Sequence, residues 1–109
     1  MILDYTQIPE QDMIHFKGGE GAAHMKPFFD GMNRIMRGRL GQGDTIGTHT
    51  HETNSEIVYV VQGTARIIMD GVEEIVTAGN AHYCPKGHTH CMANGGEGDL
   101  IIFAVVPEQ

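Results

Sequence analysis

The feature of this sequence that most restricts its fold is a succession of short apolar segments separated by turn residues, without a sustained helical period. From residue 33 onward the segments recur about every ten residues, and Asp70-Gly71 between two of them is a hairpin signal. The segments that we expect to form strands are residues 33–40, 45–51, 56–62, 64–69, 72–76, 81–85, 90–94 and 99–106. The pattern predicts an all-β chain whose antiparallel strands form a barrel or a sandwich.

The third of these segments is apolar on both of its faces. Successive side chains of a strand point to opposite sides, so Val58 and Val60 share one face while Ile57, Tyr59 and Val61 share the other. A small barrel with a single layer of strands cannot cover its own outer surface. The simplest cover is a second copy of the chain, and we therefore expect a homodimer.

The first 32 residues show no regular pattern. Glycines in the segment 18–21 mark a loop, and Pro27-Phe28-Phe29 fits either a short strand or a docking arm. With 109 residues, the chain is long enough for one domain with a buried core and too short for two. We expect an N-terminal arm and loop over residues 1–32 and a single β-barrel domain over residues 33–109.

Composition argues against several classes of partner. The formal net charge is −7, and the seven Lys and Arg residues form no run, whereas a phosphate backbone requires clustered basic side chains. We therefore expect neither nucleic acid nor an anionic membrane surface as a partner. The longest apolar run, residues 100–106, is too short to span a bilayer, and the N-terminus lacks the pattern of a secretory signal. Cys84 and Cys91 are expected to be free thiols in a reducing cytoplasm.

Histidine is unusually frequent, with seven residues, and its distribution indicates a metal site. His49 and His51 are two residues apart, so on a strand both imidazoles point to the same side. Glu56 opens the next strand and His90 opens a later one, so a hairpin and a neighbouring strand can bring both to the imidazoles. Taken alone, the His-x-His pair also fits a polar outward face. Three neutral imidazoles and one carboxylate suit a borderline divalent ion, and four ligands on an octahedral ion leave two positions open.

Two stretches around these residues resemble the sequence motifs of the cupin family. The first reads Gly43, five residues, His49-Thr50-His51, four residues, Glu56, six residues and Gly63. The second reads Gly79, five residues, Pro85-Lys86-Gly87, two residues, His90, three residues and Asn94. Both agree with the family motifs at every defined position, and together they span residues 43–94, about half of the chain.

The resemblance implies a β-barrel of the cupin jelly-roll type with a metal ion in its interior. It carries over His49, His51, Glu56 and His90 as the ligands of one divalent ion per subunit. Neither the residues nor the resemblance distinguishes among Mn, Zn, Fe, Ni and Co. An intact ligand set argues against a vestigial site, because buried imidazoles and a carboxylate are costly without a partner.

Other residues near the predicted site have two interpretations each. Met92 follows His90 by two residues and is expected to line the cavity. His82 is interpreted as a satisfied histidine near the barrel mouth, with a contact to the ligands or to a substrate as the alternative, and it is a second candidate for the cavity lining. Arg37 and Arg39 share one strand face, which favours solvated side chains over a substrate clamp at the cavity mouth.

An ion with a residual positive charge and open positions is expected to bind a small anionic or polyoxygenated molecule, such as a hydroxy, keto or dicarboxylic acid or a sugar-like compound. The resemblance implies either a small metalloenzyme or a non-catalytic binding or sensor protein. We favour the enzyme, with isomerisation, decarboxylation and dioxygenation all open. Oxalate decarboxylases of the family have two domains and an arginine at the position of Ile46, which argues against a full decarboxylase mechanism here.

Overall fold

Turn residues and alternating side chains divide the chain into ten strands in the computed structural model, which describes residues 1–109. The elements are β1 (Gln11–Ile14), η1 (Phe16–Gly18, a 3-10 turn), β2 (Ala22–Phe29), β3 (Asn33–Leu40), β4 (Thr45–Thr50), β5 (Glu56–Gln62), β6 (Thr64–Met69), β7 (Val72–Thr77), β8 (Ala81–Cys84), β9 (Thr89–Asn94) and β10 (Leu100–Pro107). Each strand expected from residue 33 onward is present, with ends that agree to within one residue. The structure contains no helix with the length and apolar character needed to cross a membrane.

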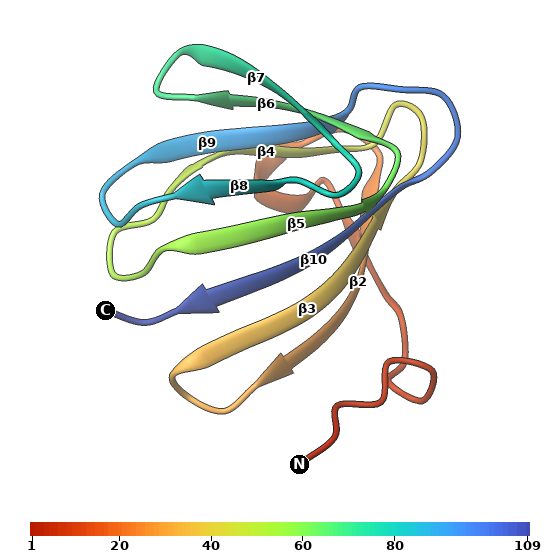
Figure 1. Ribbon diagram of the computed structural model, residues 1–109, viewed down its shortest axis with the longest axis vertical. Coiled ribbons are helices and arrows are strands. Elements are labelled where there is room, and N and C mark those ends of the chain that lie inside the picture. Colours follow the sequence, from red (N-terminus) through yellow and green to blue (C-terminus); the bar gives the residue numbers. More distant parts are fainter.

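The strands form two antiparallel sheets that face each other (Figure 1). The larger sheet has the order β1-β2-β3-β10-β5-β8, and the smaller has the order β4-β9-β6-β7. From β3 to β10 the chain changes sheet at every connection except the β6–β7 hairpin. This confirms the predicted all-β jelly-roll barrel. One consequence for the site is that residues close in sequence, on β4 and β5, approach it from opposite sheets.

The core fills the space between the sheets. Every second side chain of β5, β6 and β10 points into this space, as the period of a strand requires. The buried apolar side chains of these three strands are Val58, Val60, Ala65, Ile67, Leu100, Ile102, Ala104 and Val106. Four polar residues are also buried, namely His51, Ser55, His82 and His90. Because a buried polar group is costly unless it is hydrogen-bonded, these histidines need partners inside the protein.

Residues 11–29 contribute two strands to the larger sheet. β2 pairs with β3, where Phe28 lies opposite Ile35, and β1 pairs with β2. Ala23 and Met25 of β2 point inward and are buried in the same core. Pro27 lies beyond the part of β2 that pairs with β1, where a strand edge tolerates a residue without an N–H. Pro27 also breaks the simple alternation, which is why the sequence of this segment looks irregular.

Candidate metal centre

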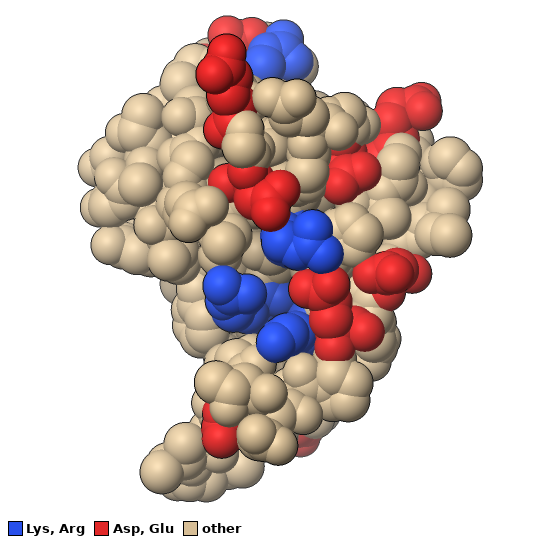
Figure 2. Space-filling model, turned by 90° about the vertical axis from the view of Figure 1, so that its right-hand side faces the viewer, with Lys and Arg blue, Asp and Glu red and all other residues tan.

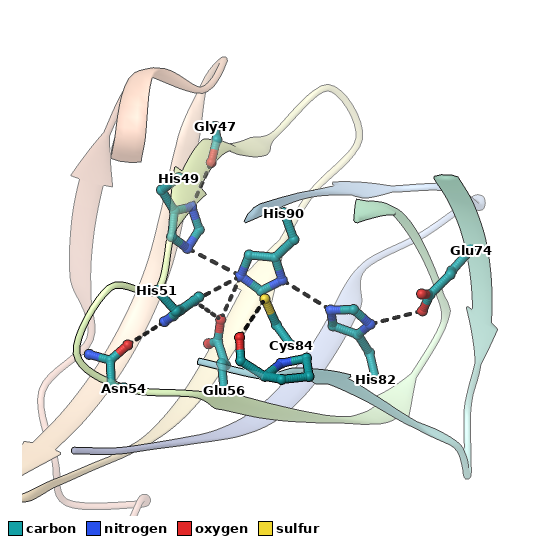
Figure 3. A network of polar contacts seen from close by, with 10 residues as sticks. Gly47, His49, His51, Asn54, Glu56, Glu74, His82, Cys84 and His90 are labelled. Atoms are coloured by element: carbon teal, nitrogen blue, oxygen red, sulfur yellow. Dashed lines mark hydrogen bonds and ion pairs between the residues drawn. The ribbon is translucent and has the colours of Figure 1, made fainter. Parts of the chain in front are cut away.

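Four side chains from both sheets meet at one place inside the barrel (Figure 3). His49 on β4 lies directly opposite His90 on β9 in the smaller sheet. His51 follows the end of β4, and Glu56 is the first residue of β5 in the larger sheet. The loop 52–55 carries the chain from one sheet to the other, so the carboxylate reaches the imidazoles from across the barrel. The structure thus brings together His49, His51, Glu56 and His90, as the sequence predicted.

The ligand atoms of the four side chains lie close to one another. His90 Nε2 is 3.0 Å from His51 Nε2, 3.2 Å from His49 Nε2 and 3.0 Å from Glu56 Oε1. His51 Nε2 is 3.3 Å from the same carboxylate oxygen. Adjacent ligands that share an ion at about 2.1 Å stand roughly 3 Å apart. The separations therefore fit a single metal ion held by all four residues.

Groups behind two of the imidazoles determine which ring nitrogen faces the cluster. His49 Nδ1 donates to the carbonyl of Gly47 at 2.8 Å, and His51 Nδ1 donates to Asn54 Oδ1 at 2.5 Å. Asn54 in turn donates its amide N–H to Glu108 Oε1 at 3.0 Å, which turns the amide oxygen toward His51. With the proton on Nδ1, both Nε2 atoms keep a lone pair that points into the cluster. Imidazole lone pairs and a negatively charged carboxylate oxygen repel one another at these distances unless a cation lies between them.

The acid–base properties of the cluster agree with this need for a cation. Burial alone would raise the pKa of Glu56, but the hydrogen bond from His51 and the neighbouring His90 ring outweigh it and hold the pKa at about 2. The same hydrogen bond to Glu56 raises the pKa of His51, whereas burial lowers the pKa of His49. In the absence of a metal ion, a proton on His51 neutralises the carboxylate. A divalent ion competes with that proton for the same lone pair.

The cluster opens into a cavity of about 510 Å³. Much of the cavity wall is apolar and includes Met13, Phe16, Met25, Met36, Ile46, Met92, Ile102 and Val106. Met92, a candidate for the cavity lining, is among these side chains. His82 is not part of the wall but lies fully buried behind His90, with His82 Nε2 3.0 Å from His90 Nδ1.

The basic side chains at the cavity are Lys17 and Arg34, neither of which the sequence analysis singled out. Arg34 shares the inward face of β3 with Met36, a spacing that could have identified it, whereas the glycine-rich loop around Lys17 offers no such signal. Arg37 and Arg39 lie on the other face, and Arg39 pairs with Glu10 at 2.9 Å. Figure 2 shows one face of the molecule on which basic side chains lie directly beside acidic ones and form no extended basic surface.

Comparison with known proteins agrees with the geometry. The family model described as "Cupin domain" matches residues 36–106. The oxalate-binding protein of Thermotoga maritima is 27% identical over 112 residues, which cover 97% of this chain and 93% of that protein. The crystal structure of a predicted oxalate decarboxylase from Thermotoga maritima has a TM-score of 0.93 at 25% identity and covers 100% of both chains. KdgF from Halomonas sp. has a TM-score of 0.80 at 19% identity, covers 100% of this chain and 94% of that chain, and shares the fold.

Proposed function

The chain belongs to the cupin family, and we propose that it uses one divalent metal ion, held by His49, His51, Glu56 and His90, to bind a small oxygen-rich acid. The observation that carries this proposal is the convergence of three imidazole Nε2 atoms and one carboxylate oxygen, with His90 Nε2 3.0 to 3.2 Å from each of the other three ligand atoms. Such a donor set suits Mn, Zn, Fe, Ni and Co alike. When bound, the ion would supply Lewis-acid chemistry to an oxygen ligand.

The surroundings of the cluster support an anionic ligand. A divalent ion with a single carboxylate ligand keeps a formal charge of about +1. Lys17 and Arg34 line the same cavity, and the Arg34 guanidinium lies 4.4 Å from the centre of the Phe29 ring, which holds it at the cavity. A guanidinium binds a carboxylate through two parallel hydrogen bonds. The relative that binds oxalate by its name supports a small dicarboxylate or a related keto or hydroxy acid.

We propose that the protein is a small metalloenzyme rather than a carrier. The apolar part of the cavity wall excludes water, and the electrostatic interactions of a bound acid are stronger where water is excluded. Lys17 and Arg34 would orient the acid from the side of the cavity. The reaction stays open among isomerisation, decarboxylation and dioxygenation. The alternative is a non-catalytic binding protein, which the name of the oxalate-binding relative supports.

The first experiment measures the metal. Elemental analysis of the purified protein should find about one divalent ion per chain, and the ion should raise the melting temperature because it binds only the folded state. His51→Ala should lose the ion and the rise in melting temperature. His88→Ala is the matched control, because His88 forms the other His-x-His pair with His90 but is half exposed and bonded to Asp70. A protein without metal, whose melting curve is unchanged by Mn, Zn, Fe, Ni and Co, would refute the proposal.

The second experiment measures the ligand. Calorimetry should show that oxalate binds the metal-loaded protein and not the metal-free protein, with acetate at least about tenfold weaker because it lacks the second carboxylate. Arg34→Gln should weaken oxalate binding by about tenfold, whereas Arg37→Gln, on the opposite face of the same strand, should leave it unchanged. Equal binding to both protein forms would contradict a metal-centred site. Consumption of oxalate or of an α-keto acid by the loaded protein distinguishes the enzyme from the carrier.

We also propose a homodimer formed through the outer face of the larger sheet. In the single chain, Ile57, Tyr59 and Val61 of β5 are 44%, 46% and 50% exposed, and Tyr83 of β8 is 53% exposed. Tyr83 and Ile57 are paired across neighbouring strands, so the side chains form one continuous apolar surface. The outward positions of β5, β8 and β10 carry no charged side chain although the chain has a net charge of −7. Two copies can therefore approach here without repulsion between like charges, which favours an isologous contact.

A further inference from the structure

Two polar side chains, one buried and one partly exposed, occupy inward-facing strand positions behind the metal centre. His82 is on the inward face of β8, and its side chain is fully buried. Glu74 is on the inward face of β7, directly opposite the fully buried Ile67 of β6. Neither residue is a ligand of the proposed ion. The buried imidazole of His82 costs folding free energy unless it is hydrogen-bonded, whereas the Glu74 side chain is 36% exposed, so the partners of His82 indicate what it does.

The two side chains form a continuous chain of hydrogen bonds that ends at the metal centre (Figure 3). Glu74 Oε1 lies 2.9 Å from His82 Nδ1, and His82 Nε2 lies 3.0 Å from His90 Nδ1. The rings of His82 and His90 are 26° from parallel, with their centres 5.2 Å apart. This series of hydrogen bonds runs from Glu74 on β7 in the smaller sheet to His82 on β8 in the larger sheet, and back to His90 on β9 in the smaller sheet. It therefore connects the two sheets beside the cluster.

The direction of these hydrogen bonds follows from chemistry. An ionised carboxylate only accepts, so His82 Nδ1 carries the proton and donates to Glu74. In a neutral imidazole the other nitrogen is then an acceptor, so His82 Nε2 accepts from His90 Nδ1–H. With its proton on Nδ1, His90 keeps a bare lone pair on Nε2. Glu74 thus selects the tautomer of His90 through the ring of His82.

His90 is the ligand for which the wrong tautomer would do most harm. Its Nε2 is within 3.0 to 3.2 Å of the ligand atoms of His49, His51 and Glu56. A proton on this atom would occupy the middle of the cluster, where the ion has to lie. His49 and His51 have the Gly47 carbonyl and the Asn54 amide oxygen behind them, and His82 is the corresponding acceptor for His90.

We propose that His82 and Glu74 are positioning residues of the metal centre, which hold His90 in the Nδ1–H tautomer with Nε2 directed at the ion. The proposal rests on the metal site proposed above. Removing the hydrogen-bond partner behind a ligating histidine lowers metal affinity by about 10- to 100-fold. His82→Phe should therefore weaken metal binding by that factor, and Glu74→Leu should weaken it less, because His82 can still accept in one of its two tautomers.

The first test needs no metal. Nitrogen-15 NMR of the imidazole rings in the metal-free protein distinguishes the two tautomers of His90. The wild type should show His90 protonated on Nδ1, and Glu74→Leu should shift it toward a mixture of tautomers. If His90 keeps the same tautomer in Glu74→Leu, or is protonated on Nε2 in the wild type, the proposal is wrong whatever the protein does with metal.

The second test measures zinc affinity by competition with a chelator. His82→Gln should restore much of the affinity lost in His82→Phe, because its amide oxygen can replace Nε2 as the acceptor, and a merely space-filling role predicts no such rescue. Glu73→Leu is the matched control, because Glu73 is the neighbouring residue on the outward face of β7 and pairs with Arg66; it should bind zinc like the wild type. If Glu74→Leu and Glu73→Leu bind zinc equally well, the positioning role is refuted. Failure of the wild type to bind any metal would instead refute the metal site, and the NMR test would still stand.

Discussion

Asp44, in the turn between β3 and β4, connects the N-terminal strands to the rest of the barrel. Its Oδ1 accepts from the backbone N–H of Ala22 at 3.1 Å, and its Oδ2 accepts from the backbone N–H of Gly41 at 2.8 Å. Burial alone would raise the pKa of Asp44, but these two hydrogen bonds and the nearby His24 lower it below 3.8. One ionised carboxylate therefore anchors the start of β2, the strand whose Met25 lines the cavity.

We expect Asp44→Asn to lower the free energy of unfolding at neutral pH by about 1 kcal/mol, because the amide cannot accept both hydrogen bonds as well as a carboxylate does. The pKa in the folded state is lower than in the unfolded state, so the folded chain holds the proton less tightly. The contribution of Asp44 is therefore complete above about pH 4 and is lost as the pH falls through the lowered pKa. Urea unfolding of both proteins at several pH values measures the difference. A difference that does not shrink below pH 4 would contradict this role.

At the scale of elements, the packing of η1 against β4 forms one side of the cavity. A Cβ placed on Gly47 would lie 2.1 Å from the carbonyl oxygen of Lys17, and one on Gly19 would lie 2.2 Å from that of Thr45. The two backbones thus touch directly, and only residues without a side chain allow it. This contact places Phe16 and Lys17 at the cavity wall. It also lies beside the Gly47 carbonyl that accepts from His49.

Gly47→Ala should therefore separate η1 from β4 and lower the free energy of unfolding by about 2 to 3 kcal/mol, since the clash is with backbone atoms that cannot turn away. It should also weaken metal binding, because the carbonyl behind His49 moves. Gly96→Ala is the control, since a Cβ there meets Thr64 at an ordinary 3.4 Å. Denaturant unfolding and metal titration of both variants make the comparison. Equal stability of the two variants would show that the contact is not needed.

At the scale of the whole molecule, the outward positions of β5, β8 and β10 form an apolar face on the larger sheet. The sequence predicted that both faces of the strand over residues 56–61 are buried. In the single chain, Val58 and Val60 on the inner face are buried, whereas the side chains on the outer face are about half exposed. Only contact with another molecule can cover that face. The proposed homodimer would bury this strand surface.

We expect light scattering to give about twice the 11.9 kDa mass of one chain at micromolar concentration. Ile57→Lys should reduce the mass to that of one chain, because it places two like charges at the contact. Val72→Lys is the matched control, since Val72 is also an exposed strand residue, at 64%, but belongs to β7 in the other sheet. A wild type that scatters as one chain would contradict the dimer, and so would an Ile57→Lys variant that stays dimeric.

Local signals in the sequence determined much of what the structure contains. Alternating side chains and turn residues depend only on neighbours along the chain, so they predicted the strands from β3 to β10. The spacing of His49 and His51 placed both imidazoles on one side of a strand, and the resemblance to the two cupin motifs implied that Glu56 and His90 complete the cluster. The strand predictions need no knowledge of which strands lie side by side.

The tertiary structure alone decided which groups surround the cluster. Asn54 meets Glu108 only because the C-terminal segment bridges to the loop after β4. Glu74 could be identified as the partner of His82 only from the fold, because β7 and β8, the last strands of their sheets, come together across the barrel. Arg34 and Lys17 likewise reach the cavity from separate parts of the chain. Strand formation follows from local periodicity, whereas the partner of a polar side chain depends on how the two sheets pack, which the sequence of either strand does not encode by itself.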